Sequence, residues 1–337
     1  MVAEAERQRR YRVPDRDLRL GNARVCYPRP QWFYDTNRAG ARKMRPILRA
    51  MAAYVRSLSP YCRVAVLAYT ALLIFLNYHF AVEPRIMQWP VLPRLMAWYL
   101  LFAVAYWIPW LLQGAPVGPR FRILALIAPA LFAMKLALPF PSWLSALTGA
   151  SEYWQRVLYY PFKLLLTGAM LLGLWRCFDA DRPFYGTGAP RSSSRPYALM
   201  LLFMLPLIAA ASTQPDFLSI YPKWWHYDSV RQASGMKKLV YELSYGSDFI
   251  TIELFFRGFL VLAFGRIAGT KAILPMAVFY CTIHFGKPLG ECISSFFGGI
   301  VLGVVSYHTG SIRGGLLVHL GIAWLMELGG WLGHLWH

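Results

Sequence analysis

The chain has 337 residues, of which 57% are hydrophobic and only 15% are charged, and its mean hydropathy is +0.38. Soluble domains carry about 25% charged residues, so this composition excludes an ordinary soluble protein and predicts a polytopic membrane protein. The formal net charge of +19 would suit nucleic-acid binding, but residues 1–63 alone hold 15 basic and five acidic side chains.

Residues 1–60 are therefore predicted to be a basic N-terminal tail. A basic excess before the first apolar run is typical of a cytoplasmic segment, and anionic lipid headgroups are its expected partner, so we expect no nucleic acid. Met44–Leu58 could form an interfacial helix, and an irregular tail is equally compatible with the sequence. No apolar segment precedes residue 64, so the first span is expected to act as an uncleaved anchor rather than a secretory signal.

Apolar runs follow from residue 64 to the end of the chain. Backbone groups in lipid must hydrogen-bond within their own segment, so these runs predict helices. Several runs are shorter than the roughly 20 residues of a straight span, so the fold class is an all-α polytopic membrane protein with about 8–9 transmembrane helices. The runs are Val64–Phe80, Leu95–Leu112, Ile123–Leu138, Val157–Trp175, Tyr197–Ala211, Leu239–Phe264, Ala272–Phe285, Ile293–Tyr307 and Gly315–Trp331.

Two polar connectors divide these runs. The basic, Gly- and Ser-containing stretch Arg176–Arg195 resembles a cytoplasmic loop, and residues 61–213 are expected to form the N-terminal transmembrane helices. Gln214–Lys238 carries an aromatic cluster at residues 224–227, which favours an interfacial belt over a substrate contact. Residues 214–337 then form a C-terminal transmembrane core.

Glu253 and Arg257 lie inside one apolar run of this core. An ionisable residue at bilayer depth is costly, so it indicates function by default. A spacing of four places both side chains on one helical face, where they can neutralise each other. A purely structural ion pair would explain the same pattern.

His284 and His319 lie in the next apolar runs, each expected on a helix. Each needs a polar partner in lipid, so we expect them to meet Glu253 in one polar cavity. A carboxylate and two imidazoles suit the activation of water for amide hydrolysis. They could also hold zinc, but there is no HExxH motif, so we expect neither a metal nor a cofactor. Asp248 and Glu291 are further acids near these runs.

These three elements, in this order, resemble the motifs of the CPBP family, the CAAX-protease and bacteriocin-processing (Abi) intramembrane proteases. That family carries Glu-Glu-xxx-Arg, Phe-xxx-His and His-xxx-Asn or Asp on separate transmembrane helices. The resemblance covers about residues 239–325 and extends to Phe256-Arg257-Gly258, to His284-Phe285-Gly286-Lys287-Pro288 and to Val318-His319. It implies a CPBP-like helical core and intramembrane peptidase activity.

The motif set is degenerate in this chain. Alignment on Arg257 places Ile252 where the family has its first Glu, the residue usually assigned as catalytic, and Ala323 where it has the Asn or Asp that supports the oxyanion. Tyr280 stands in for the motif Phe. The resemblance then implies Glu253, His284 and His319 as candidate catalytic residues, with Arg257, Asp248 and Tyr280 in support. Asp248 is one helical turn before Ile252 and could supply the missing carboxylate.

Two functions from different classes follow. The first is a CAAX-protease-like intramembrane endopeptidase that cleaves a peptide or protein substrate in the membrane, with an activity that Ile252 and Ala323 would impair. The second is a non-catalytic scaffold or accessory subunit that binds partner membrane proteins. A transporter is disfavoured because the sequence has no inverted repeat. In either case we expect an integral membrane protein of a bacterial inner membrane with a cytoplasmic N-terminus.

Overall fold

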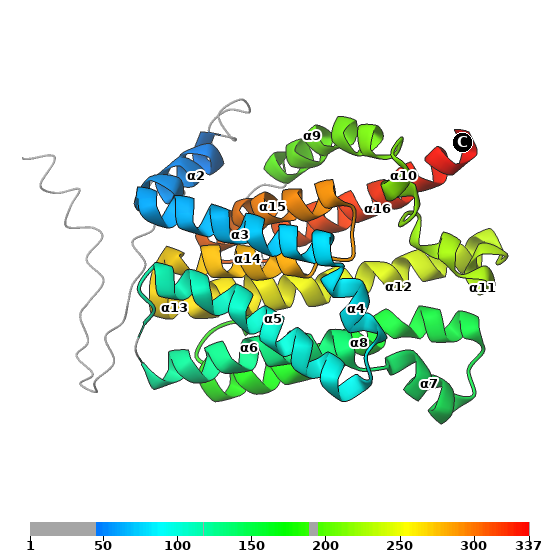
Figure 1. Cartoon of the computed structure of the whole chain (residues 1–337), viewed down its shortest axis with the longest axis horizontal. Coiled ribbons are helices and arrows are strands. Elements are labelled where there is room, and N and C mark those ends of the chain that lie inside the picture. The colour runs from blue at the N-terminus through cyan, green and yellow to red at the C-terminus, as the bar shows by residue number, and fades with distance from the viewer. Residues whose placement is uncertain (1–44, 117, 189–194, 337) are drawn as a thin grey trace, which may run out of the picture.

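The structure is a computed structural model that describes residues 45–116, 118–188 and 195–336, and every regular element among them is helical. The long helices run side by side along one axis and form a bundle (Figure 1). The prediction of an all-α membrane fold is confirmed. Most of the basic tail 1–60 lies outside the described residues, and the division at residue 213 remains a prediction.

The first half of the bundle is built from helices that follow the apolar runs. Its elements are α2 (Arg45–Ser57), α3 (Pro60–Phe80), α4 (Val82–Gln88), α5 (Val91–Leu112), α6 (Pro119–Ala137), α7 (Phe140–Thr148), α8 (Glu152–Phe178), the 3₁₀ turn η3 (Phe184–Gly186) and α9 (Arg195–Ala211).

The second half begins with short helices in the predicted aromatic connector and continues with longer ones. Its elements are α10 (Pro215–Leu218), η4 (Lys223–His226), α11 (Asp228–Arg231), α12 (Gly235–Glu253), the π-helix η5 (Leu254–Ala263), α13 (Phe264–Ala268), η6 (Gly269–Ala272), α14 (Ile273–Thr282), α15 (Leu289–Thr309) and α16 (Arg313–Trp336).

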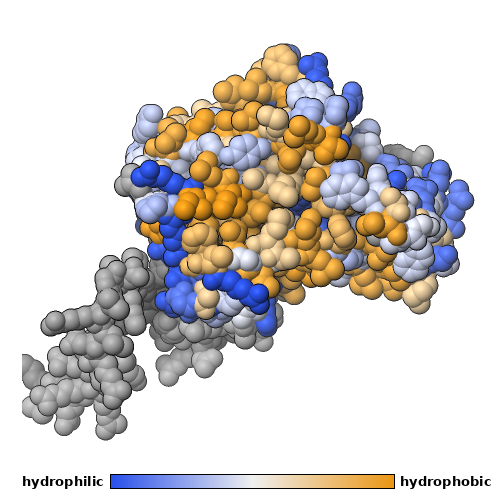
Figure 2. All heavy atoms as spheres, turned by 90° about the horizontal axis from the view of Figure 1, so that it is seen from below, coloured by the Kyte–Doolittle hydropathy of each residue, from blue (hydrophilic) through white to orange (hydrophobic). Residues whose placement is uncertain are grey.

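Five of these helices, α3, α5, α8, α15 and α16, are long and apolar enough to cross a membrane. Hydrophobic residues cover much of the surface seen in Figure 2, and hydrophilic residues gather mainly near its ends. A face of this kind is stable against lipid rather than water, so the chain is an integral membrane protein. Whether eight or nine helices cross remains a prediction.

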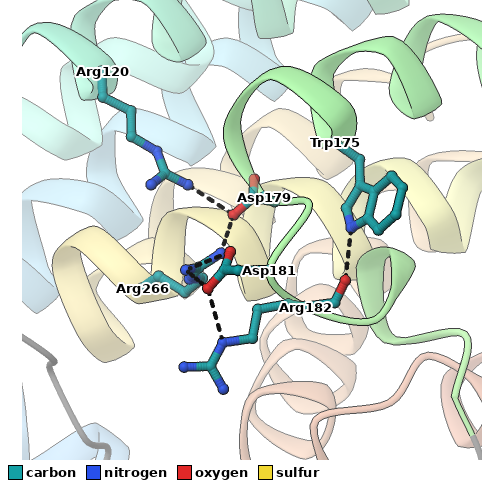
Figure 3. A network of polar contacts seen from close by, with 6 residues as sticks. All are labelled: Arg120, Trp175, Asp179, Asp181, Arg182 and Arg266. Atoms are coloured by element: carbon teal, nitrogen blue, oxygen red, sulfur yellow. Dashed lines mark hydrogen bonds and ion pairs between the residues drawn. The ribbon is translucent and has the colours of Figure 1, made fainter. Parts of the chain in front are cut away.

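Ion pairs join the two halves at one end of the bundle (Figure 3). Asp179, which is only 3% exposed, lies 2.7 Å from a guanidinium nitrogen of Arg120 on α6 and also binds Arg266 on α13. Arg266 reaches Asp181 as well, at 3.0 Å. The network fastens the connector after α8 to helices from both halves.

Close packing of α14 on α15 positions the centre of the bundle. A Cβ atom on Gly303 would lie 2.7 Å from Cε of Met276 and 3.0 Å from Cγ2 of Ile273, and one on Gly299 would lie 3.3 Å from Cα of Ala277. Small residues let membrane helices approach this closely, so both glycines serve the packing of α14 against α15.

Replacing Gly303 by Leu should lower the thermal unfolding temperature of the purified protein in detergent, because overpacking of this kind costs about 1–3 kcal/mol. Gly298→Leu is the matched control, since a Cβ there meets no atom within 4 Å. Equal melting temperatures for the two variants would contradict the packing role of Gly303.

Candidate active site

Glu253 and Arg257 meet where α12 passes into the π-helix η5. Neither side chain is exposed at all, and Oε1 of Glu253 lies 3.2 Å from Nη1 of Arg257. Gly315 on α16 makes room for this carboxylate, because a Cβ atom there would lie 2.5 Å from Oε2 of Glu253. The wide turn of a π-helix is rare and occurs frequently at functional sites.

His319 on α16 binds the same carboxylate, with Nδ1 at 3.1 Å from Oε1 of Glu253. Its Nε2 lies 2.9 Å from the hydroxyl of Tyr280 on α14. An ionised carboxylate only accepts hydrogen bonds, so Nδ1 of His319 carries the hydrogen and Nε2 accepts from the phenol. The result is a hydrogen-bonded chain from Glu253 through His319 to Tyr280.

Arg257 also contacts the aromatic ring of Tyr280. Its guanidinium carbon lies 4.3 Å from the centre of the Tyr280 ring, a cation–π distance. One carboxylate and one aromatic face therefore hold the charge of Arg257 in the apolar interior.

His284 lies in a turn after the end of α14 at Thr282, so the prediction that it lies on a helix is wrong. The cause is Pro288, which has no N–H group to donate and which disfavours helical backbone at the residue before it. The helix therefore ends before the last residues of the apolar run.

Helix α3 holds this turn in place. The side-chain amide of Asn77 donates to the carbonyl of Phe285 at 3.1 Å, and the hydroxyl of Tyr78 donates to the carbonyl of Lys287 at 2.6 Å. His284 is thus positioned by a helix far from it in the sequence.

The ring of His284 has one fixed and one open nitrogen. Its Nδ1 lies 2.9 Å from the backbone carbonyl of Tyr280, and the two rings pack edge to face at 4.7 Å. A carbonyl oxygen only accepts, so Nδ1 must donate and Nε2 is left as an unprotonated acceptor on a partly exposed ring.

The other two acids do not reach an imidazole through any contact of the described residues. Asp248 pairs with the buried Lys135 at 2.7 Å. Glu291 accepts from the hydroxyl of Tyr221 at 3.0 Å. Glu253 is the acid that binds an imidazole, and no group of three His, Cys, Asp or Glu side chains among the described residues could hold a metal ion.

The two positions that depart from the family pattern are apolar and packed. Ile252 is partly buried against aromatic neighbours, and Ala323 is 4% exposed in a cluster with Tyr245 and Phe249. Sequence reasoning missed the hydrogen bond of Tyr280, although a hydroxyl within an apolar run was a signal that it needs a partner.

Residues 247–325 match the model of a protein family described as Type II CAAX prenyl endopeptidase Rce1-like. The match includes Glu253, Tyr280, His284 and His319, and it confirms the CAAX-protease resemblance over this part of the chain. No curated protein and no solved structure matches the chain.

Arg257→Met should destabilise the protein by about 3–5 kcal/mol, because it leaves the carboxylate of Glu253 buried without its cation. Adding Glu253→Gln should recover part of the loss, since the unpaired charge is then removed as well. Chemical denaturation of the detergent-solubilised variants measures both effects, with the exposed Arg85→Met as the control. A cost for Arg257→Met no greater than for the control would rule out this dependence.

Proposed function

We propose that this chain is a CAAX-protease-like intramembrane peptidase that cleaves a peptide or protein substrate inside the membrane. The observation that carries the proposal is the position of His284 in the Rce1-like segment, where Nδ1 lies 2.9 Å from the backbone carbonyl of Tyr280 and Nε2 is left as an acceptor. No metal or cofactor is required by the steps below.

His284 is the proposed general base. Its hydrogen is held on Nδ1 by the carbonyl of Tyr280, so Nε2 can take a proton from water. The water oxygen then attacks the substrate carbonyl, and the proton returns from His284 to the leaving amine. His284 would thereby take the role of the Glu that the family has at the position of Ile252.

Tyr280 is the proposed partner of the oxyanion. Its hydroxyl is directed at Nε2 of His319, and a rotation of the O–H bond would redirect the hydrogen to a substrate oxygen beside the ring of His284. Arg257 over the face of Tyr280 favours negative charge that develops there. Tyr280 would thereby compensate for Ala323.

A second candidate function is a non-catalytic scaffold that binds partner membrane subunits. It is favoured by Ile252 and Ala323, because the loss of a general base typically costs about 10²–10⁴-fold in rate. Glu253, Arg257, His319 and Tyr280 also contact one another, as they would in a packed interior without catalysis.

Cleavage of a fluorogenic prenylated CAAX peptide by the purified protein in liposomes distinguishes the two. For a peptidase, His284→Ala should reduce kcat/KM by about 10²-fold or more, and Tyr280→Phe should reduce it as well. The exposed His79→Ala on α3 should leave the rate unchanged.

The variant Ile252→Glu with Ala323→Asn, which restores the family pattern, completes this test. Cleavage by the restored variant and none by the wild type would favour the scaffold, because the fold would then have lost only its catalytic groups. Absence of cleavage by both would overturn the peptidase proposal.

We also propose that α2 faces the cytoplasm, in a bacterial inner membrane whose anionic lipids bind the basic N-terminal segment. Figure 1 places α2 and α13 at one end of the bundle. The helix ends there carry many basic residues in the sequence, which the positive-inside rule assigns to the cytoplasmic side. The described ones include Arg56, Arg122, Arg176, Lys271 and Arg313.

In that orientation the C-terminus lies on the opposite side, because α16 ends at the other end of the bundle (Figure 1). Alkaline phosphatase fused after residue 337 should be active in bacterial cells, and green fluorescent protein fused there should be dark. A fluorescent green fluorescent protein fusion together with an inactive phosphatase fusion would show the opposite orientation.

A further inference from the structure

A groove of about 360 Å³ lies between α12 and α16, and neither Glu253, His284 nor His319 lines it. Three tryptophans, Trp224, Trp324 and Trp331, and three leucines form most of its wall. The indole of Trp324 donates to the backbone carbonyl of Glu242 at 3.4 Å and so bridges the two helices.

Two acids, Glu242 and Glu327, also line this apolar groove. Glu327 is only 5% exposed, and its Oε2 accepts from the backbone N–H of Lys223 at 2.7 Å. Its Oε1 and both carboxylate oxygens of Glu242 are buried and accept no hydrogen bond from an N–H or hydroxyl donor of the described residues, and the two carboxyl groups lie close enough to share a hydrogen. Two neighbouring carboxylates in an apolar groove are costly when both are ionised, so a cation that binds between them would stabilise the pair.

Lys223 and Lys287 act on Glu327 electrostatically without forming an ion pair with it. No ion pair among the described residues includes Glu242 or Glu327. The ammonium of Lys238 lies over the ring of Trp224 at 4.4 Å, at the rim of the groove.

We propose that this groove binds a phospholipid with a primary-amine headgroup, of the phosphatidylethanolamine type. A primary ammonium has three N–H donors and one positive charge, which suit the three carboxylate oxygens that accept no N–H or hydroxyl of the described residues. Tryptophan faces attract the same cation, and Lys238 at the rim suits the phosphate.

The acyl chains of such a lipid suit the apolar part of the groove. Leu239, Leu243 and Leu328 are 51%, 57% and 48% exposed, so in a membrane they face acyl chains. Tryptophans are typical of the headgroup level of a bilayer, which is the depth that an ammonium group requires. This binding site is independent of whether the chain hydrolyses peptides.

Native mass spectrometry of the full chain in detergent tests the proposal with four lipids of identical acyl chains. They carry ethanolamine, monomethylethanolamine, dimethylethanolamine and choline, which offer three, two, one and no N–H donors. Retention should fall stepwise along this series, with ethanolamine held about tenfold more tightly than choline.

Glu242→Gln combined with Glu327→Gln should abolish the preference, and the exposed Glu152→Gln at the same end should keep it. If the double variant does not fold, Glu242→Gln alone removes the charge from two of the three oxygens and should flatten the series. Equal retention of all four lipids by the wild type, stronger retention of phosphatidylglycerol, or an unchanged preference in the double variant would each overturn the proposal.

Discussion

A fully buried carboxylate in an apolar helical bundle has to find its partners inside the protein, and Glu253 imposes this constraint on the C-terminal core. Its charge is balanced by Arg257 one turn later and shared with His319 from α16. Breaking such a pair costs far more than its formation contributes, because the charge that remains has no water. The close approach of α16 at Gly315 and the cation–π contact with Tyr280 both belong to this arrangement.

Much of this cluster could be predicted from the sequence, because ionisable residues in apolar runs must converge. Glu253, Arg257 and His319 do meet, and each was recognised by its type and spacing. The partners of the other polar residues could not be predicted. Asp248 is held by Lys135 from a helix of the other half, and such long-range pairings depend on how helices are arranged rather than on local pattern.

Local backbone geometry also escaped prediction at two points. The run Ala272–Phe285 has the composition of a helix throughout, yet the turn before Pro288 ends the helix early. The π-helical winding of η5 has no signature in a stretch whose residues are nearly all apolar and buried. In both cases hydrophobicity predicts that the segment is buried in the membrane, but it predicts neither the end of the helix nor the helix type.

The same contacts would stabilise an enzyme and an inert scaffold. The two functions therefore differ in the polar groups that these contacts do not use. Glu253, Arg257, His319 and Tyr280 contact one another, while Nε2 of His284 makes no hydrogen bond with any residue that the structure describes. The proposed general base requires such an acceptor, and the scaffold alternative does not use it.

The attachment of the His284 turn to α3 has a consequence for biogenesis. Asn77 and its partner Phe285 are 208 residues apart, and at 5–20 residues per second the ribosome needs about 10–40 s to synthesise that interval. Helix α16, which supplies His319, is made later still. The cluster can therefore assemble only once nearly the whole chain has been inserted, so a partly made chain lacks the complete cluster.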